Sequence, residues 1–262
     1  MKLVQKQRKL MPRIGGRKLL YLLKERLPEG MTLGRDEFFD LLRDNHLLVK
    51  RRVYRVRTTY SNHWLHKYPN LIKDFVPDRA HRLWVSDITY LETSQGFIYL
   101  FLITDAYSRK IVGWSLGDTL EAKHAVTSLH MALRQLPAHV TDIFHHSDRG
   151  VQYCSAEYVK ILRKRNIKIS MTENGDPLEN AIAERINGIL KTEWINDLSL
   201  NDKQLAVKEI DKIIKTYNIR RPHGSINMMT PENAHVQEGV LKRRWKNYYK
   251  KVSDLVAEEK RL

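Results

Sequence analysis

Cysteine is nearly absent from this chain, which has one, Cys154, among its 262 residues. A single thiol excludes an internal disulfide and a zinc site built from several thiolates. No apolar run approaches the roughly 18 residues of a membrane span, and the first residues lack the apolar stretch and cleavage site of a secretory signal. These absences predict a soluble, cytoplasmic protein. With 42% hydrophobic residues, the chain can form a packed core.

Acidic residues are outnumbered by basic ones, and the formal net charge is +16. Residues 1–82 carry 20 Lys and Arg against 8 Asp and Glu, residues 83–196 carry 12 against 13, and residues 197–262 carry 14 against 9. A near-neutral centre between basic flanks predicts a polyanion that is held by the flanks and processed in the middle. Positive charge indicates nucleic acid without saying which kind, and a merely basic protein is the alternative.

Residues 1–58 predict a small basic helical module. Residues 1–12 are polar and basic and predict a disordered or truncated beginning. Leucines at helical spacing over residues 16–27, and a second apolar pattern over residues 34–42, predict two helices. With the basic run that follows, they resemble a helix-turn-helix; a helical hairpin docked on the core is the alternative. We expect that run to touch DNA phosphates through Arg51, Arg52 and Arg55.

A change of texture separates a linker from a catalytic core. Residues 59–82 have no sustained period and predict a linker, whose Trp64 and Tyr68 either stack on bases or pack on the core. The core, residues 83–196, has the predicted order βββαβαβα of an RNase H-like α/β fold, a mixed five-stranded sheet with helices on both faces. Its predicted strands span residues 83–91, 97–104, 110–116, 140–144 and 167–171, and its helices span residues 120–136, 157–165 and 176–194.

Two aspartates stand where this fold brings strands together. Asp87 lies inside the first strand and alternates with Val85 and Thr89, so it points as core residues do. An ionised group there is costly unless it is paired or bound to a cation; a carboxylate satisfied by hydrogen bonds is the alternative. Asp148 follows the fourth strand, which lies beside the first in this fold. Its alternative role is to cap the next helix.

A glutamate completes the predicted set. Glu184 lies eight residues into the last core helix, on the face of Asn180 and Asn187. Three carboxylates suit a hard cation, Mg²⁺ or Mn²⁺, and two ions roughly 4 Å apart would clamp a phosphodiester. Lys191 follows two turns later on nearly the same face and predicts a DNA phosphate contact; an ordinary surface lysine is the alternative.

Three sequence blocks carry a family resemblance. W-V-S-D-I-T-Y-L, H-S-D-R-G-V-Q-Y and E-N-A-I-A-E-R-I-N-G-I-L-K-T-E resemble the catalytic blocks of transposases and integrases with a retroviral-integrase-like core. The 35 residues between Asp148 and Glu184 match the family's D-D-35-E signature, and Lys191 matches its following basic residue. The pattern is most similar to the second-frame product of bacterial insertion sequences with two overlapping frames, the insertion-sequence-three family.

The resemblance implies an activity and partners. Asp87, Asp148 and Glu184 would be the metal ligands for strand cleavage and for transfer of a 3′-hydroxyl to a new phosphodiester. Implied partners are element-end DNA, target DNA, further copies of the chain and a first-frame protein. This chain has no heptad run of the kind that the family's first-frame segment supplies, and no Cys and His set for zinc. We expect His145 and His146 to be hydrogen-bonded rather than metal-bound.

Further DNA contacts are assigned to exposed polar side chains. Residues 197–262 predict a helical extension with one amphipathic helix and a basic, aromatic tail. The turn Arg220-Arg221-Pro222-His223 predicts exposed charge that either contacts DNA or stabilises the turn. The tail would lie along DNA or dock on a second subunit. The assigned residues are Arg149, Asn180, Asn187, Arg221, His223, Arg243 and Arg244. For Arg149 the alternative is that it only orients its neighbour.

Two other functions share these features. An RNase H-type nuclease would cut DNA without joining it, and a DNA-binding regulator would keep the fold without catalysis. Joined product that depends on the three carboxylates distinguishes a transposase from both.

Overall fold

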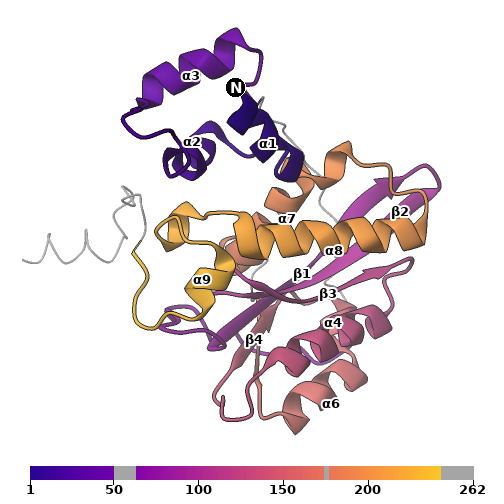
Figure 1. The fold of residues 1–262 in the computed structure, drawn as a ribbon. Helices are drawn as coiled ribbons and strands as arrows, with labels where there is room; N and C mark the ends of the chain where they lie inside the picture. Colours follow the sequence, from indigo (N-terminus) through magenta and orange to yellow (C-terminus); the bar gives the residue numbers. More distant parts are fainter. Residues whose placement is uncertain (50–62, 174–176, 243–262) are drawn as a thin grey trace, which may run out of the picture.

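Five strands form one mixed sheet in the computed structural model, which describes residues 1–49, 63–173 and 177–242. The strand order is β3-β2-β1-β4-β5, with β1, β2 and β3 antiparallel and β4 parallel to both β1 and β5. This sheet confirms the predicted RNase H-like architecture (Figure 1). The strands are Leu83–Thr93 (β1), Gly96–Asp105 (β2), Ile111–Gly117 (β3), Phe144–Ser147 (β4) and Lys168–Met171 (β5).

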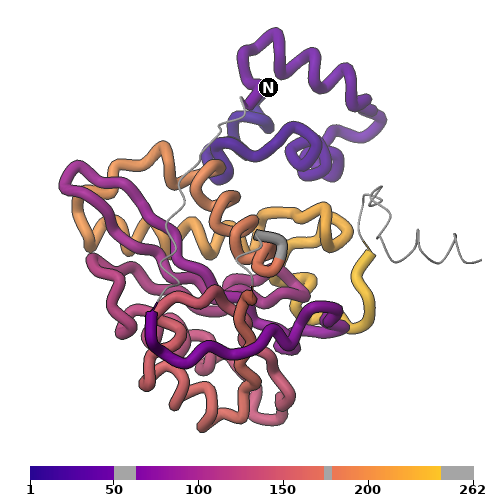
Figure 2. The backbone as a smooth tube through the Cα atoms, turned by 180° about the vertical axis from the view of Figure 1, so that it is seen from behind, coloured from indigo at the N-terminus to yellow at the C-terminus, as the bar shows by residue number. Residues whose placement is uncertain are grey.

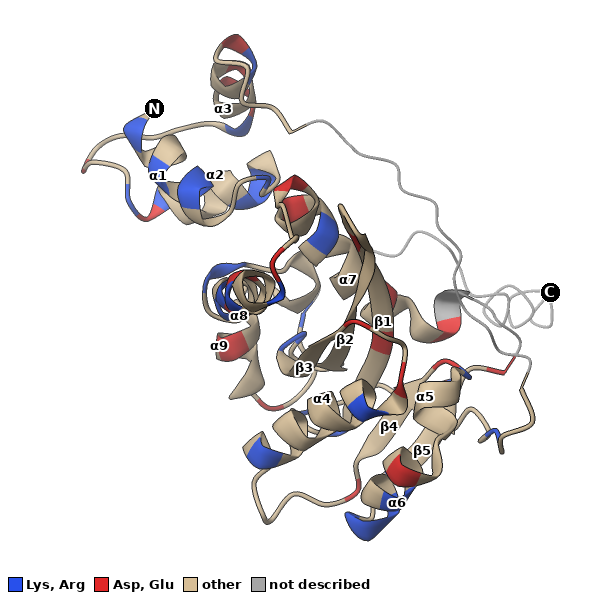
Figure 3. Ribbon diagram, turned by 90° about the vertical axis from the view of Figure 1, so that its right-hand side faces the viewer, with Lys and Arg blue, Asp and Glu red and all other residues tan. Residues whose placement is uncertain are grey.

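Alternation along β2 builds two cores, one on each face of the sheet. Leu100 and Leu102 join one buried cluster, whereas Phe101 and Ile103 join the other. Successive side chains of a strand point to opposite faces, so an uninterrupted apolar strand must be covered on both. Figure 3 shows α8 nearly along its axis, with α4 and α6 across the sheet.

Helices cover both faces. The helix that contains Ser128 approaches β3 closely because Gly113 has no side chain. A Cβ at Gly113 would lie 2.2 Å from the Ser128 carbonyl oxygen. One face carries Ala122–Gln135 (α4), Val151–Cys154 (α5) and Ala156–Lys164 (α6). The other carries Ala181–Glu193 (α7) and Lys203–Arg220 (α8), with short helices Pro177–Asn180 (η1), Ile195–Asp197 (η2), Gly224–Ile226 (η3) and Pro231–His235 (α9) along this part of the chain.

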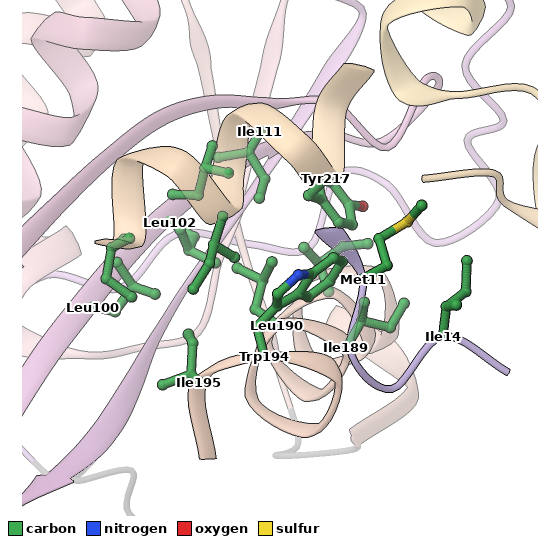
Figure 4. Close-up of a cluster of buried hydrophobic side chains, with 14 of the residues drawn as sticks. Met11, Ile14, Leu100, Leu102, Ile111, Ile189, Leu190, Trp194, Ile195 and Tyr217 are labelled. Carbon is green, nitrogen blue, oxygen red and sulfur yellow. The ribbon is translucent and has the colours of Figure 1, made fainter. Parts of the chain in front are cut away.

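The N-terminal residues pack on the core. Their helices are Lys2–Leu10 (α1), Gly16–Lys24 (α2) and Arg35–Asp44 (α3). The prediction of a disordered beginning is wrong, because Val4 and Gln7 of α1 are buried. Met11 and Ile14 lie in the same cluster as side chains of α7 and α8 (Figure 4). The described helices of this module are docked on the core, and its residues 50–58 lie outside the described residues. Its resemblance to a helix-turn-helix stays a prediction.

The segment predicted as a linker lies along the core. From residue 63 to β1 the chain crosses the back of the molecule to the side where the C-terminal part runs (Figure 2). Arg79 forms a β-bridge with Glu238 at that end. Tyr68 packs on the cluster around Trp84, as its alternative predicted, whereas Trp64 is 92% exposed.

Among the described residues, no helix combines the length and the apolar character that crossing a membrane requires.

Candidate active site

The parallel pairing of β1 and β4 brings the two aspartates together. Leu83, Trp84 and Val85 are paired with Phe144, His145 and His146 in that order. Asp87 and Asp148 each lie two residues beyond the last of these pairs. The two aspartates therefore stand at the same level of the sheet, Asp87 within β1 and Asp148 directly after β4, as the strand order predicts.

Asp87 is held on the α7 side of the sheet. It is paired with Leu102 on β2, and the Leu102 side chain belongs to the buried cluster that also contains side chains of α7. Its Oδ2 accepts a hydrogen bond from Asn187 Nδ2 at 2.8 Å, and its Oδ1 accepts from the Ile88 backbone N–H at 2.9 Å. Burial, and then the charge of Asp148, raises the pKa of Asp87 to about 7.

Asp148 sits in the turn after β4. Its Oδ1 accepts from the Gly150 backbone N–H at 3.0 Å, and burial raises its pKa. Gly150, not Asp148, is the N-cap of α5. The capping alternative is therefore wrong, and the carboxylate instead accepts a hydrogen bond within its own turn.

Glu184 lies in the first turn of α7 with an exposed side chain, and partial desolvation raises its pKa. Its charge contributes weakly to the raised pKa of Asp87, so the glutamate is within electrostatic range. Within the described residues, however, no three acidic, histidine or cysteine side chains are gathered closely enough to hold a metal ion. The structure thus assembles the aspartate pair and leaves Glu184 beside it.

Polar side chains of α7 and of Asn180, the residue just before it, fasten the helix to β1. Asn180 Nδ2 donates to the Ser86 carbonyl at 3.0 Å, Asn187 donates to Asp87, and Lys191 Nζ donates to the Tyr90 carbonyl at 3.0 Å. Burial lowers the pKa of Lys191. All three were predicted to contact DNA, yet each makes an intramolecular contact here. The Oδ1 atoms of both asparagines are buried and have no hydrogen-bond partner among the described residues.

The two histidines before Asp148 are neutral and hydrogen-bonded, which confirms the predicted hydrogen bonding. His145 Nε2 lies 2.8 Å from both the Ser86 and the Tyr158 hydroxyl oxygens, and His146 Nδ1 lies 2.9 Å from the Ser170 hydroxyl oxygen. Burial lowers the pKa of His145 to about 3 and that of His146 to about 4. They stabilise β4 beneath the aspartates without adding positive charge.

Comparison with known proteins identifies the family. Two models, both described as integrase core domain, match residues 77–177 and 165–231. The Shigella sonnei protein called insertion element IS600 uncharacterized 31 kDa protein is 34% identical over 213 residues, which span 80% of this chain and 78% of that protein. Further relatives carry the name transposase, and the chain belongs to the insertion-sequence transposases with an integrase core.

One further relative agrees with this membership, and one solved structure shares the fold. The transposase for insertion sequence element IS629, also from Shigella sonnei, is 32% identical over 76% of this chain and 66% of its own length. A chain of the simian T-cell lymphotropic virus intasome, in complex with a PP2A regulatory subunit, superposes with a TM-score of 0.51 at 17% identity, covering 95% of this chain and 80% of that chain. At that identity the second likeness shows the fold alone.

One contributor to this transposase's site was missed by the sequence analysis. His63, in the segment predicted as a linker, places Nε2 2.6 Å from the Arg149 carbonyl oxygen. His63 also acts to lower the pKa of Asp148, against the larger effect of burial, which raises it. Nothing in the local sequence around His63 indicates a partner 86 positions later. Arg149 itself has a buried Nε without a hydrogen-bond partner among the described residues.

The prediction of exposed charge at Arg221 and His223 is wrong. Their exposed fractions are 1% and 5%. Arg221 pairs with Glu193 through two hydrogen bonds of 2.8 and 2.6 Å, and its Nη1 lies 2.9 Å from His223 Nε2. Burial lowers the pKa of His223 well below its ordinary value. The structure assigns both residues the alternative role, stabilising the turn after α8.

The remaining predicted DNA contacts lie outside the described residues: Arg51, Arg52, Arg55, Arg243 and Arg244.

Proposed function

We propose that the chain catalyses metal-dependent cleavage of DNA at the ends of an insertion element and joins the freed 3′ ends to new phosphodiesters. Asp87, Asp148 and Glu184 would hold Mg²⁺ or Mn²⁺. The observation that carries the proposal is the pairing of β1 with β4, which sets the two aspartates side by side. Family membership supports the same reaction.

The residues present fit a hard divalent cation. All three donors are carboxylate oxygens, which suits Mg²⁺ or Mn²⁺. A pKa of about 7 for Asp87 reflects buried negative charge that a cation would relieve. Two bound ions would supply activation of the attacking hydroxyl and stabilisation of the leaving oxygen. Within the described residues the three carboxylates are not gathered, so the Glu184 side chain would have to turn toward the aspartates to complete the ligand set.

The side chains around the carboxylates have defined tasks. Asn187 fixes the orientation of the Asp87 carboxylate through its donated hydrogen bond. Neutral His145 and His146 leave the negative potential of the site intact. Lys191 lies on α7 and Arg149 lies in the turn of Asp148, and we assign both cations to DNA phosphates. For Lys191 this means exchanging the Tyr90 carbonyl for a phosphate.

DNA ends and other copies of the chain are the proposed partners. The flanking segments carry the excess of basic residues, and two strand ends must be brought together for joining. We therefore expect a homo-oligomer on DNA. A protein from a first reading frame would add end recognition, and target DNA would accept the ends.

A strand-transfer assay with labelled element ends and Mg²⁺ tests the proposal. Asp87→Asn, Asp148→Asn and Glu184→Gln should each lower joining by at least about 100-fold and leave DNA binding within about twofold. Glu209→Gln, an exposed carboxylate on α8, is the control and should join normally. Joined product that survives Asp87→Asn contradicts the proposed ligands. Hydrolysis without joined product in the unaltered protein supports the nuclease alternative instead.

A further inference from the structure

Residues 63–73, called the strap below, contact two other segments of the chain. One is the turn that carries Asp148, and the other leads into the helix that carries Glu184. At the start of the strap, His63 Nε2 lies 2.6 Å from the carbonyl oxygen of Arg149, next to Asp148. A carbonyl oxygen only accepts, so the histidine must carry its proton on Nε2 and donate. Its Nδ1 is buried and without a hydrogen-bond partner among the described residues. This hydrogen bond requires a proton on Nε2 and ties the strap to the turn of Asp148.

Further along, the strap reaches the beginning of α7. Asn70 Nδ2 donates to Glu179 Oε1 at 3.1 Å, and the Asn70 backbone N–H donates to Glu173 Oε1 at 3.0 Å. Glu179 also accepts from the Glu173 backbone N–H at 2.7 Å through its other oxygen. One asparagine thus contacts side chains on both sides of the entry to the helix that carries Glu184.

The middle of the strap is anchored to the sheet beneath the aspartates. The Leu71 backbone N–H donates to the Ser170 hydroxyl oxygen at 2.9 Å, and the same hydroxyl lies 2.9 Å from His146 Nδ1. The Met171 backbone N–H donates to the Pro69 carbonyl at 3.3 Å. The anchor gives the strap a fixed register, so its two ends have defined positions.

We infer that the strap positions the metal ligands, with His63 setting the turn of Asp148 and Asn70 setting the start of the helix of Glu184. The inference rests on the proposed function, because it treats those carboxylates as ligands. Residues that orient ligands without touching the ion commonly change metal affinity 10- to 100-fold when they are replaced. His63 and Asn70 are positioning residues in this sense. The strap also joins the N-terminal segment to the active site in sequence.

Substitutions of His63 that keep or lose the donor test the first contact. Glutamine carries an amide N–H near the position of imidazole Nε2, whereas asparagine places it near Nδ1. We expect His63→Asn to weaken Mn²⁺ binding about tenfold and His63→Gln to bind within about twofold of the unaltered chain. Titration calorimetry on the full chain, with Mn²⁺ alone and no DNA, measures the affinity. Equal affinities for the two variants would overturn the inference.

Asn70→Asp tests the second contact, because it keeps the acceptor for the Ile72 backbone N–H and removes the donor to Glu179. It should also weaken Mn²⁺ binding about tenfold. Trp64→Ala, at a 92% exposed strap position, is the matched control and should change nothing. An Asn70→Asp chain that binds like this control would remove Asn70 from the inference.

Hydrogen exchange gives a readout that needs no metal. The Gly150 backbone N–H donates to Asp148 Oδ1, so its exchange rate reports the turn of Asp148. His63→Asn should speed that exchange at least about fivefold, and His63→Gln should not. If the unaltered chain fails to bind Mn²⁺, the proposed function fails. Unchanged Gly150 exchange in His63→Asn instead refutes the strap.

Discussion

Asp87 makes the stability of the metal-free site depend on pH. Its pKa, about 7, lies far above the ordinary 3.8, so between these values the folded chain holds a proton that the unfolded chain releases. Its contribution to stability is therefore fully present below pH 4 and is lost as the pH rises toward 7. Asparagine at this position does not titrate.

We expect the melting temperature of metal-free Asp87→Asn, minus that of the unaltered chain, to rise by at least about 3 °C between pH 4 and pH 7. Taking the difference cancels the histidines whose pKa values burial lowers, because both chains share them. Above pH 7 the difference should level off. Calorimetry at several pH values measures it, and a difference that is constant across the range contradicts the raised pKa.

The closeness of Asp87 and Asp148 could be predicted from the sequence, but the surroundings of the two aspartates could not. The role of Glu184 as a third ligand stays a prediction. Asp87 interrupts an apolar alternation and Asp148 ends a strand, so each has a local signature. Arg221 was predicted as exposed because its neighbours are charged or turn-forming. Its partner Glu193 lies 28 positions earlier, on another helix. A pairing of that kind depends on how α7 and α8 pack, and local sequence does not record it.

At the scale of elements, the contact of α4 with β3 depends on one missing side chain. A Cβ on Gly113 would lie 2.2 Å from the Ser128 carbonyl oxygen and 3.1 Å from Ala132 Cβ. Both obstacles belong to the body of α4, so neither can move without shifting the helix. We expect Gly113→Ala to lower the free energy of unfolding by about 2 kcal/mol or more, as overpacking does in other cores. Urea denaturation measures the loss.

Gly188 on α7 offers the matched substitution. A Cβ there meets nothing within 4 Å, and the position is inside a helix. Gly188→Ala should therefore stabilise the chain by roughly 0.5–1 kcal/mol, because alanine is the better helix former. Similar effects of the two alanines would contradict the steric role of Gly113.

Element boundaries were least predictable where polar residues are buried. The fourth strand was expected over residues 140–144, and β4 is Phe144–Ser147. His145 and His146 look like turn residues in isolation, but in the folded chain Ser86 and Tyr158 contact the first and Ser170 contacts the second. A similar limit applies to α1, whose Val4 and Gln7 are buried only through contacts with elements elsewhere in the sequence. The sequence pattern predicts element type well and burial of polar ends poorly.

On the scale of the whole molecule, the first helices and the catalytic sheet share one core. Trp194, at the end of α7, donates its indole N–H to the Leu10 carbonyl at 2.9 Å. Met11 and Ile14 are fully buried in the cluster that contains this tryptophan. A module that completes the core of its neighbour cannot unfold alone without exposing that neighbour. The described N-terminal helices and the sheet should therefore behave as one cooperative unit.

Methionine substitutions test this cooperativity. Met11→Ala removes a side chain from the shared cluster and should lower the free energy of unfolding by about 2–5 kcal/mol. Met31→Ala, at a position 56% exposed between α2 and α3, should change it by less than about 0.5 kcal/mol. Fluorescence and circular dichroism during urea denaturation should give a single coincident transition for each chain. An early transition confined to Met11→Ala would instead show that the first helices unfold independently, because loss of Met11 would then free them while the sheet kept its own stability.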